Sequence, residues 1–175
     1  MGDWFVGIDP GNKGALVALG PDDELIVCPG ERPAGMGWRS DPDRYSALLS
    51  VMQARACDDR IAMGFLETQQ ARARPQGQAK LNREQGVWEG WLMAHSLPYR
   101  MVLPRGANGW RKPLGRANFK KGENPKVWTA QVVERMLPNL DARFDGRLRT
   151  YHDGVTDAAG MALAAVFAIM TQYLL

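Results

Sequence analysis

The chain has 175 residues, of which 45% are apolar and 23% charged, and its formal net charge is +3. That is one domain of ordinary globular composition, which excludes whole-chain disorder and collagen-like repeats. The only cysteines are Cys28 and Cys57, and no C-x-x-C or His/Cys cluster occurs. A disulfide framework and a structural zinc site are therefore disfavoured, and we expect reduced thiols, a cytoplasmic location and no disulfide-linked partner. The longest apolar run, Ala158 to Met170, is shorter than the about 20 residues of a membrane span, so we expect a core helix there and no membrane partner.

Charge is unevenly distributed along the chain. Between Thr68 and Lys126 there are twelve Lys or Arg and three Glu, whereas the remainder has a net charge of −6. A basic middle between acidic flanks suggests a polyanion held near a group of carboxylates. A solvated basic surface explains the same charges equally well, so both readings stay open at this point.

The first thirty residues predict three short strands. Trp4–Ile8 is rich in β-forming residues and stops at the turn sequence Asp9-Pro10-Gly11-Asn12. Ala15–Leu19 and Leu25–Cys28 follow, each ended by Gly and Pro. Such tight connections favour an antiparallel meander.

The rest of the chain alternates helices with strands. Helices are predicted from Ser40 or Asp41 to Ala56, over Asn82–Ser96, from Asn124-Pro125 to Leu137, and from Asp153 onward; strands are predicted over Ile61–Leu66 and Tyr99–Leu103, and a polar loop over Thr68–Lys80. With no repeat and no long linker, we expect residues 1–175 to form a single α/β domain. The order of elements predicts a mixed five-stranded sheet, with three antiparallel strands followed by parallel ones and helices on both faces.

Four carboxylates fall where a metal site would need them. Asp9 and Glu67 end the first and fourth strands, and Asp153 and Asp157 lie four residues apart on one face of the last helix. Converging negative charges repel one another and need cations, which Mg²⁺ supplies while accepting oxygen ligands. Two such ions about 3.5–4 Å apart activate a water and stabilise the leaving oxygen in phosphodiester cleavage. Taken singly, each acid is also explained as a turn, salt-bridge or helix-capping residue.

These segments resemble the RuvC group of Holliday-junction resolvases. Val6-Gly7-Ile8-Asp9-Pro10-Gly11 followed by Gly14-Ala15-Leu16-Val17 resembles the opening of that family, and Phe65-Leu66-Glu67 resembles its second acidic strand. His152-Asp153-Gly154-Val155-Thr156-Asp157-Ala158 resembles its acidic C-terminal helix, especially in phage-type variants. Leu103-Pro104-Arg105 and Trp110-Arg111-Lys112 resemble the basic segment between the second and third acidic blocks.

The resemblance implies a ribonuclease H-like fold, a homodimer, and Mg²⁺-dependent cleavage of branched DNA in a bacterial cell or phage-infected host, with Mn²⁺ as a substitute ion. The metal-site acids of the family match Asp9, Glu67, Asp153 and Asp157, and its basic residue near the scissile phosphate matches Lys126. Some members use histidine at the third position, so the resemblance leaves open whether His152 or Asp153 binds metal. This chain departs from many cellular members in spacing its last two acids by four residues and in lacking an aromatic residue soon after Glu67.

The basic middle supplies the candidate DNA contacts. Phosphate contacts are predicted for Arg72, Arg74, Lys80, Arg105, Arg111, Lys112, Arg116, Lys120 and Lys121. Gln76 and Gln78 are candidates for base or sugar contacts, and Trp110 either stacks on a base or anchors its loop. Trp88 and Trp91, with Gly86 and Gly90 on the same helix, favour core packing over the alternative of a dimer interface.

The leading hypothesis is a metal-dependent, structure-selective DNA endonuclease that resolves four-way junctions or other branched DNA by hydrolysis. A non-catalytic branched-DNA-binding protein on the same fold is the first alternative, although carboxylates facing phosphate would not help a pure binder. An RNA–DNA hybrid nuclease is the nearest catalytic alternative. The Gly7–Gly11 turn also resembles the phosphate-binding hairpin of actin-like phosphotransferases, but those need two such domains.

Overall fold

A computed structural model describes residues 2–10, 14–29, 60–68, 75–106, 109–140 and 153–172. The predicted helix ending at Ala56 lies outside these residues. The elements are β1 (Asp3–Asp9), β2 (Ala15–Leu19), a 3-10 turn (Pro21–Asp23), β3 (Leu25–Pro29), β4 (Arg60–Glu67), α2 (Pro75–Ala94), β5 (Tyr99–Val102), α3 (Pro125–Met136) and α4 (Asp153–Gln172).

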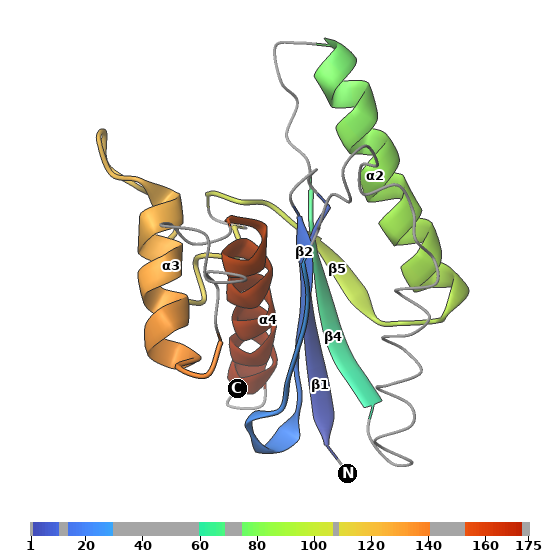
Figure 1. Cartoon of the computed structure of the whole chain (residues 1–175), viewed down its shortest axis with the longest axis horizontal. Coiled ribbons are helices and arrows are strands. Elements are labelled where there is room, and N and C mark those ends of the chain that lie inside the picture. The colour runs from blue at the N-terminus through green and yellow to red at the C-terminus, as the bar shows by residue number, and fades with distance from the viewer. Residues whose placement is uncertain are drawn as a thin grey trace.

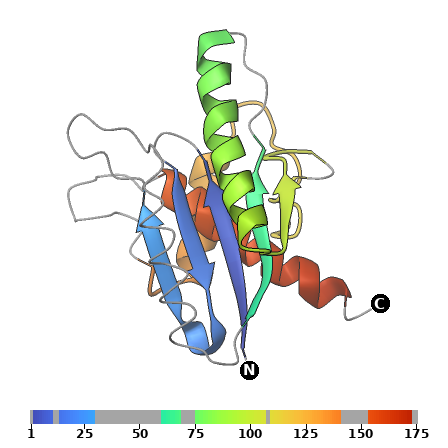
Figure 2. The same ribbon diagram turned by 90° about the vertical axis from the view of Figure 1, so that its right-hand side faces the viewer.

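The five strands form one mixed sheet in the order β3-β2-β1-β4-β5. β1, β2 and β3 pair antiparallel, and β1 with β4 and β4 with β5 pair parallel, as the sequence predicts. α4 lies on one face of the sheet with α3 outside it, and α2 covers the other face (Figure 1). Seen from the side, α2 runs along the strands and extends beyond their ends (Figure 2).

Alternation along the strands divides the core between the two faces of the sheet. Trp4, Val6 and Ile8 of β1 pack with Trp88 and Leu92 of α2. The opposite face packs on the helices, where side chains of β2 meet α3 and α4 and those of β4 and β5 meet α4. Trp88 and Leu92 are therefore core residues, which agrees with the favoured prediction for this helix.

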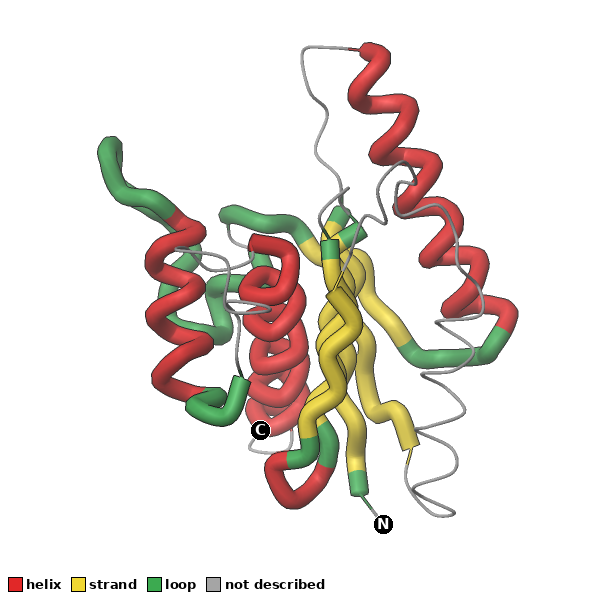
Figure 3. Tube along the Cα trace, viewed as in Figure 1, coloured by secondary structure: helices red, strands yellow, loops and turns green. Residues whose placement is uncertain are grey.

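α4 is the central helix of the fold. Its residues Asp153–Thr171 are long and apolar enough to cross a membrane, with a mean hydropathy of 1.6, yet 61% of that window is buried inside the fold. Ala158, Ala159 and Ala162 pack against the sheet and α3, and the tube in Figure 3 shows the helix lying between α3 and the strands. The predicted core helix is confirmed, and its many alanines allow the close packing.

Gly7 lets α4 approach the sheet backbone to backbone. A Cβ atom on Gly7 would lie 1.9 Å from the carbonyl oxygen of Ala158 and 2.6 Å from the amide nitrogen of Ala162. Only glycine fits at that distance, because any larger residue would push the helix away. This contact fixes the first turns of α4, which carry Asp153 and Asp157, beside the end of β1.

The predicted loop over Thr68–Lys80 is wrong from Pro75 onward, because α2 begins there. Proline is well suited to the first turn of a helix, and the Gln, Ala and Lys that follow it are good helix formers. The prediction weighted polarity over helix propensity. In α3 the predicted start is confirmed, since the Asn124 side chain accepts a hydrogen bond from the Lys126 backbone nitrogen at 3.0 Å.

Replacing Gly7 with alanine should destabilise the protein, because the new methyl group meets backbone that has no room to move. We expect the free energy of unfolding in urea to fall by about 2 kcal/mol or more. Gly64→Ala in β4 is the matched control, since its nearest neighbour would be 3.4 Å away, and its effect should be below about 1 kcal/mol. Equal stability losses for the two variants would contradict the proposed role of Gly7.

Candidate active site

Strand register brings Asp9 and Glu67 together. β1 and β4 run parallel with Ile8 opposite Leu66, so Asp9 and Glu67 end their strands side by side. Phe65 packs with residues of α4, and because side chains alternate along a strand, Glu67 faces the same side. Asp9 lies two residues after Gly7 and also faces α4. The two predicted strand-end acids therefore meet beneath the first turns of α4.

α4 adds one buried and one exposed carboxylate. Asp157, next to the Gly7 contact, is only 9% exposed. The side chain of Asp153, one turn earlier, is 55% exposed. Both lie in the helical turns over the strand ends, as predicted, but Asp157 points into the protein and Asp153 lies at the rim.

Asp9, Glu67 and Asp157 interact electrostatically. Burial raises the pKa of the Glu67 carboxyl well above 4.5, and the negative charges of Asp9 and Asp157 raise it further. Arg111 and the indole N–H of Trp110 act against that rise in pKa. We call Asp9, Glu67 and Asp157 the acid cluster, because the charges of Asp9 and Asp157 both make a negative charge on Glu67 more costly.

Arg111 is the buried cation of the acid cluster. Its Nη2 donates to Oδ1 of Asp157 at 2.7 Å, its Nε donates to Oγ1 of Thr129 at 2.9 Å, and its Nη1 donates to the Pro104 carbonyl at 2.7 Å. The guanidinium lies 3.9 Å from the centroid of the Trp110 ring. Arg111 is 4% exposed, and each of its three guanidinium nitrogens donates one hydrogen bond inside the protein, which contradicts the predicted phosphate contact.

Trp110 is also buried, which contradicts the predicted stacking on a base. It is 1% exposed and packs where α4 carries Gly160, whose absent Cβ would lie 2.7 Å from the Trp110 ring. The alternative prediction, that Trp110 anchors its loop, is correct. Within the described residues its indole Nε1 has no hydrogen-bond acceptor of good geometry, although Glu67 lies near enough to be affected by it.

Asp157 and Asp153, the two carboxylates of α4, interact with different basic side chains. Burial raises the pKa of the Asp157 carboxyl, Arg111 and Lys126 lower it, and Asp153 raises it. Asp153 Oδ2 accepts a hydrogen bond from Nζ of Lys126, and both side chains of that pair are more than half exposed. Lys126, in the first turn of α3, therefore reaches the rim of the acid cluster, where the sequence places it.

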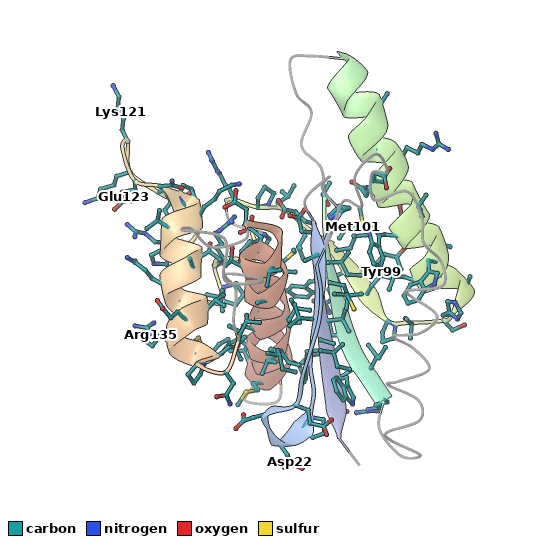
Figure 4. The ribbon with its side chains drawn as sticks, viewed as in Figure 1. Asp22, Tyr99, Met101, Lys121, Glu123 and Arg135 are labelled. Carbon is teal, nitrogen blue, oxygen red and sulfur yellow. The ribbon has the colours of Figure 1, made fainter. Side chains whose placement is uncertain are left out.

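The remaining candidate residues fall into four groups. Arg105, Lys112, Lys120 and Lys121 are exposed. Arg116 is half-buried, with its Nη2 2.5 Å from Oε1 of Glu123, and Lys121 and Glu123 lie at the far end of the loop that leads into α3 (Figure 4). Gln76, Gln78 and Lys80 lie in the first turns of α2, with side chains outside the described part. Arg72, Arg74 and His152 lie outside the described residues.

The donor chemistry of the acid cluster fits a hard divalent cation. All three ligands would be carboxylate oxygens, and a cation would remove the mutual repulsion that burial intensifies. Among the described residues, no three His, Cys, Asp or Glu side chains are arranged to hold an ion as they stand. Ion binding would therefore draw the carboxylates of Asp9, Glu67 and Asp157 closer together.

Two participants in the site are not apparent from the sequence. Thr129 accepts from Arg111 and donates from the same oxygen to the Pro125 carbonyl at 2.8 Å, which ties α3 to the acid cluster. Nothing in the sequence around Thr129 signals this role. Gly7 is visible in the sequence only as part of a motif, although a glycine two residues before a strand-end acid is a usable signal for a close helix contact.

Comparison with solved structures identifies the fold. RuvC of Thermus thermophilus in complex with a Holliday junction substrate matches with a TM-score of 0.55 at 16% identity, covering 98% of this chain and 96% of that chain. A second T. thermophilus RuvC structure matches with a TM-score of 0.55 at 17% identity, covering 98% and 97%. The chain has the RuvC fold. No protein-family model and no curated protein matches the sequence.

That likeness confirms the expected ribonuclease H-like α/β architecture. The RuvC fold here consists of the mixed sheet with its helical layers. The acid cluster lies at the end of β1 and β4, where the first turns of α4 cover the sheet.

The pKa of Glu67 predicts a distinct pH dependence of stability. Because its pKa is raised in the folded state, the native protein binds the Glu67 proton more tightly than the unfolded chain does, and stability falls as pH rises above 4.5. Unfolding in EDTA between about pH 5 and 8 should show wild type losing stability relative to Glu67→Gln, with a limiting slope of about 1.4 kcal/mol per pH unit. Parallel curves for the two proteins would show that the pKa of Glu67 is not raised in the folded protein.

Proposed function

We propose that this protein is a metal-dependent endonuclease acting on branched DNA, with the four-way junction as its substrate. The observation that carries the proposal is the acid cluster of Asp9, Glu67 and Asp157 at the strand ends of a RuvC fold. A hard cation held by oxygen ligands beside the phosphate can drive phosphodiester hydrolysis at neutral pH, and the acid cluster offers such oxygen ligands. A solved structure with this fold is in complex with a Holliday junction substrate.

Each acidic residue has its own part in the proposal. Asp9, Glu67 and Asp157 hold Mg²⁺, with Asp153 or His152 completing the ligand set at the rim, and Mn²⁺ substitutes. The bound ions supply the Lewis acidity and the activated water that cleavage requires. Lys126 exchanges its exposed contact with Asp153 for a contact with the scissile phosphate. Breaking the first contact loses little free energy, because exposed ion pairs contribute about 0–1 kcal/mol.

The DNA surface is the exposed part of the loop between β5 and α3. Arg105, Lys112, Lys120 and Lys121 present their charges to solvent there, and Arg111 in the same loop reaches the acid cluster. Phosphate contacts from such a loop position a duplex without reading its sequence. That arrangement suits selection by DNA shape.

The active form is proposed to be a homodimer built on α2. On this helix Val87 is 39% and Met93 is 65% exposed, and the space above Gly86 and Gly90 is open. A second copy of the helix would cover these apolar side chains, and a two-fold enzyme matches the two-fold symmetry of a four-way junction. Sedimentation of the free protein measures this oligomeric state directly.

The alternatives make different demands on the acid cluster. A protein that only binds branched DNA would gain nothing from a buried carboxylate cluster facing phosphate, since the like charges repel. A nuclease of RNA–DNA hybrids would need the same cluster, so substrate comparison separates it from the junction nuclease. The proposal predicts faster cleavage of the four-way junction than of the hybrid or of linear duplex.

Asp9→Asn should abolish junction cleavage in Mg²⁺ while the protein still binds the junction. Loss of one metal-holding carboxylate removes several kcal/mol of transition-state stabilisation, so we expect kcat to fall by roughly 10²–10³-fold. The measurement is single-turnover cleavage of a synthetic four-way junction, with junction binding measured in EDTA.

Asp22→Asn is the matched control for that experiment. Asp22 is an exposed acid in the turn between β2 and β3, at the end of the sheet away from the acid cluster (Figure 4). Its positive φ of 55° is also well tolerated by asparagine, so activity should be unchanged. Full cleavage by Asp9→Asn, or junction binding by wild type without cleavage in either Mg²⁺ or Mn²⁺, would contradict the proposed function.

A further inference from the structure

Arg111 is held more rigidly than any role in solvent requires. Its three guanidinium nitrogens donate to three acceptors on separate segments: the Pro104 carbonyl at the start of the loop between β5 and α3, Thr129 of α3 and Asp157 of α4. The Trp110 ring covers one face of the guanidinium. Fixing the rotamers of a long side chain has an entropic cost, and an arginine that binds phosphate from solvent keeps most of that rotamer freedom.

The network fixes only one oxygen of Asp157. Arg111 Nη2 donates to Oδ1, and within the part of the chain that the structure describes Oδ2 accepts no hydrogen bond. A planar guanidinium with all its nitrogens engaged holds that carboxylate in one orientation. Oδ2 is thereby kept available to a ligand.

We propose that Arg111 is a positioning residue of the acid cluster, which fixes the Asp157 carboxylate by Oδ1 so that Oδ2 is presented to a divalent cation. This inference rests on the proposed function, because it assumes that the acid cluster is the metal site. Arg111 contacts neither DNA nor the reacting atoms. Its function is to orient a ligand and to tie that ligand to α3 and to the loop.

Geometry and charge can be separated by substitution. Arg111→Lys keeps the positive charge beside Asp157 but cannot make three bonds in one plane, so it tests orientation while electrostatic attraction is retained. Thr129→Val keeps Arg111 itself and removes one of its acceptors with little change in shape. If Arg111→Lys fails to fold, Thr129→Val tests the same network.

The experiment measures Mn²⁺ affinity by calorimetry, kcat for junction cleavage, and junction affinity in EDTA. Arg111→Lys should lose about 10–100-fold in Mn²⁺ affinity or kcat, as partners of metal ligands commonly do, and Thr129→Val should lose less in the same direction. Junction affinity in EDTA should be unchanged in both variants, because neither side chain is available to phosphate.

Two controls separate positioning from general stability. Arg60→Lys alters a second Arg–Asp pair, the 2.8 Å contact with Asp3, which lies at the exposed start of β4. Leu163→Ala, on α4, lowers stability by opening a cavity in the cluster that α4 forms with β2 and α3. At a temperature where every variant is folded, both controls should bind Mn²⁺ as wild type does.

The outcomes that overturn the inference are distinct from those that overturn the proposed function. Wild-type Mn²⁺ affinity and kcat in Arg111→Lys would show that Arg111 positions nothing. Lost junction affinity with unchanged Mn²⁺ affinity would make Arg111 a DNA contact instead. An equal loss of Mn²⁺ affinity in Leu163→Ala would show that Arg111 acts only through overall stability. Absence of Mn²⁺ binding and of cleavage in wild type would overturn the proposed function, and this inference with it.

Discussion

The backbone contact between Gly7 and α4 is the constraint from which the site follows. Because Gly7 has no side chain, α4 lies directly on β1 and carries Asp157 to the strand ends where Asp9 and Glu67 emerge. That proximity creates a buried repulsion among carboxylates, which raises the pKa of Glu67. Cations relieve this repulsion, and the protein supplies two of its own, Arg111 and Lys126.

Arg111 and Lys126 differ in how firmly each is held at the site. Arg111 is buried and held by three acceptors, so removing it from Asp157 would leave a charge without compensation at a cost of about 3–5 kcal/mol. Lys126 meets Asp153 in solvent, where an ion pair contributes about 0–1 kcal/mol and is readily exchanged. The acid cluster thus has one fixed positive charge and one that can be released to a phosphate.

The sequence predicts the parts of the site that depend on patterns among residues close together in the chain. Asp9 and Glu67 each follow a run of β-forming residues, and Asp153 and Asp157 are spaced for one helix face, so their elements and their common edge are predictable. Trp110 and Arg111 are different, because a loop rich in Gly, Lys and Arg predicts exposure. Only the packing of Trp110 against Gly160 turns that loop inward, and such a contact between distant segments leaves no periodic signal. The start of α2 at Pro75 differs from the prediction for the opposite reason: the segment is polar, which favours a loop, but several of its residues have good local helix propensity.

Anomalous diffraction from crystals grown with Mn²⁺ would locate the ion relative to the three carboxylates of the acid cluster. We expect a Mn²⁺ peak bound by carboxylate oxygens of Asp9, Glu67 and Asp157, with Asp157 using Oδ2 while Oδ1 remains on Arg111. A peak located elsewhere, or a Glu67 carboxyl remote from those of Asp9 and Asp157, would contradict this expectation.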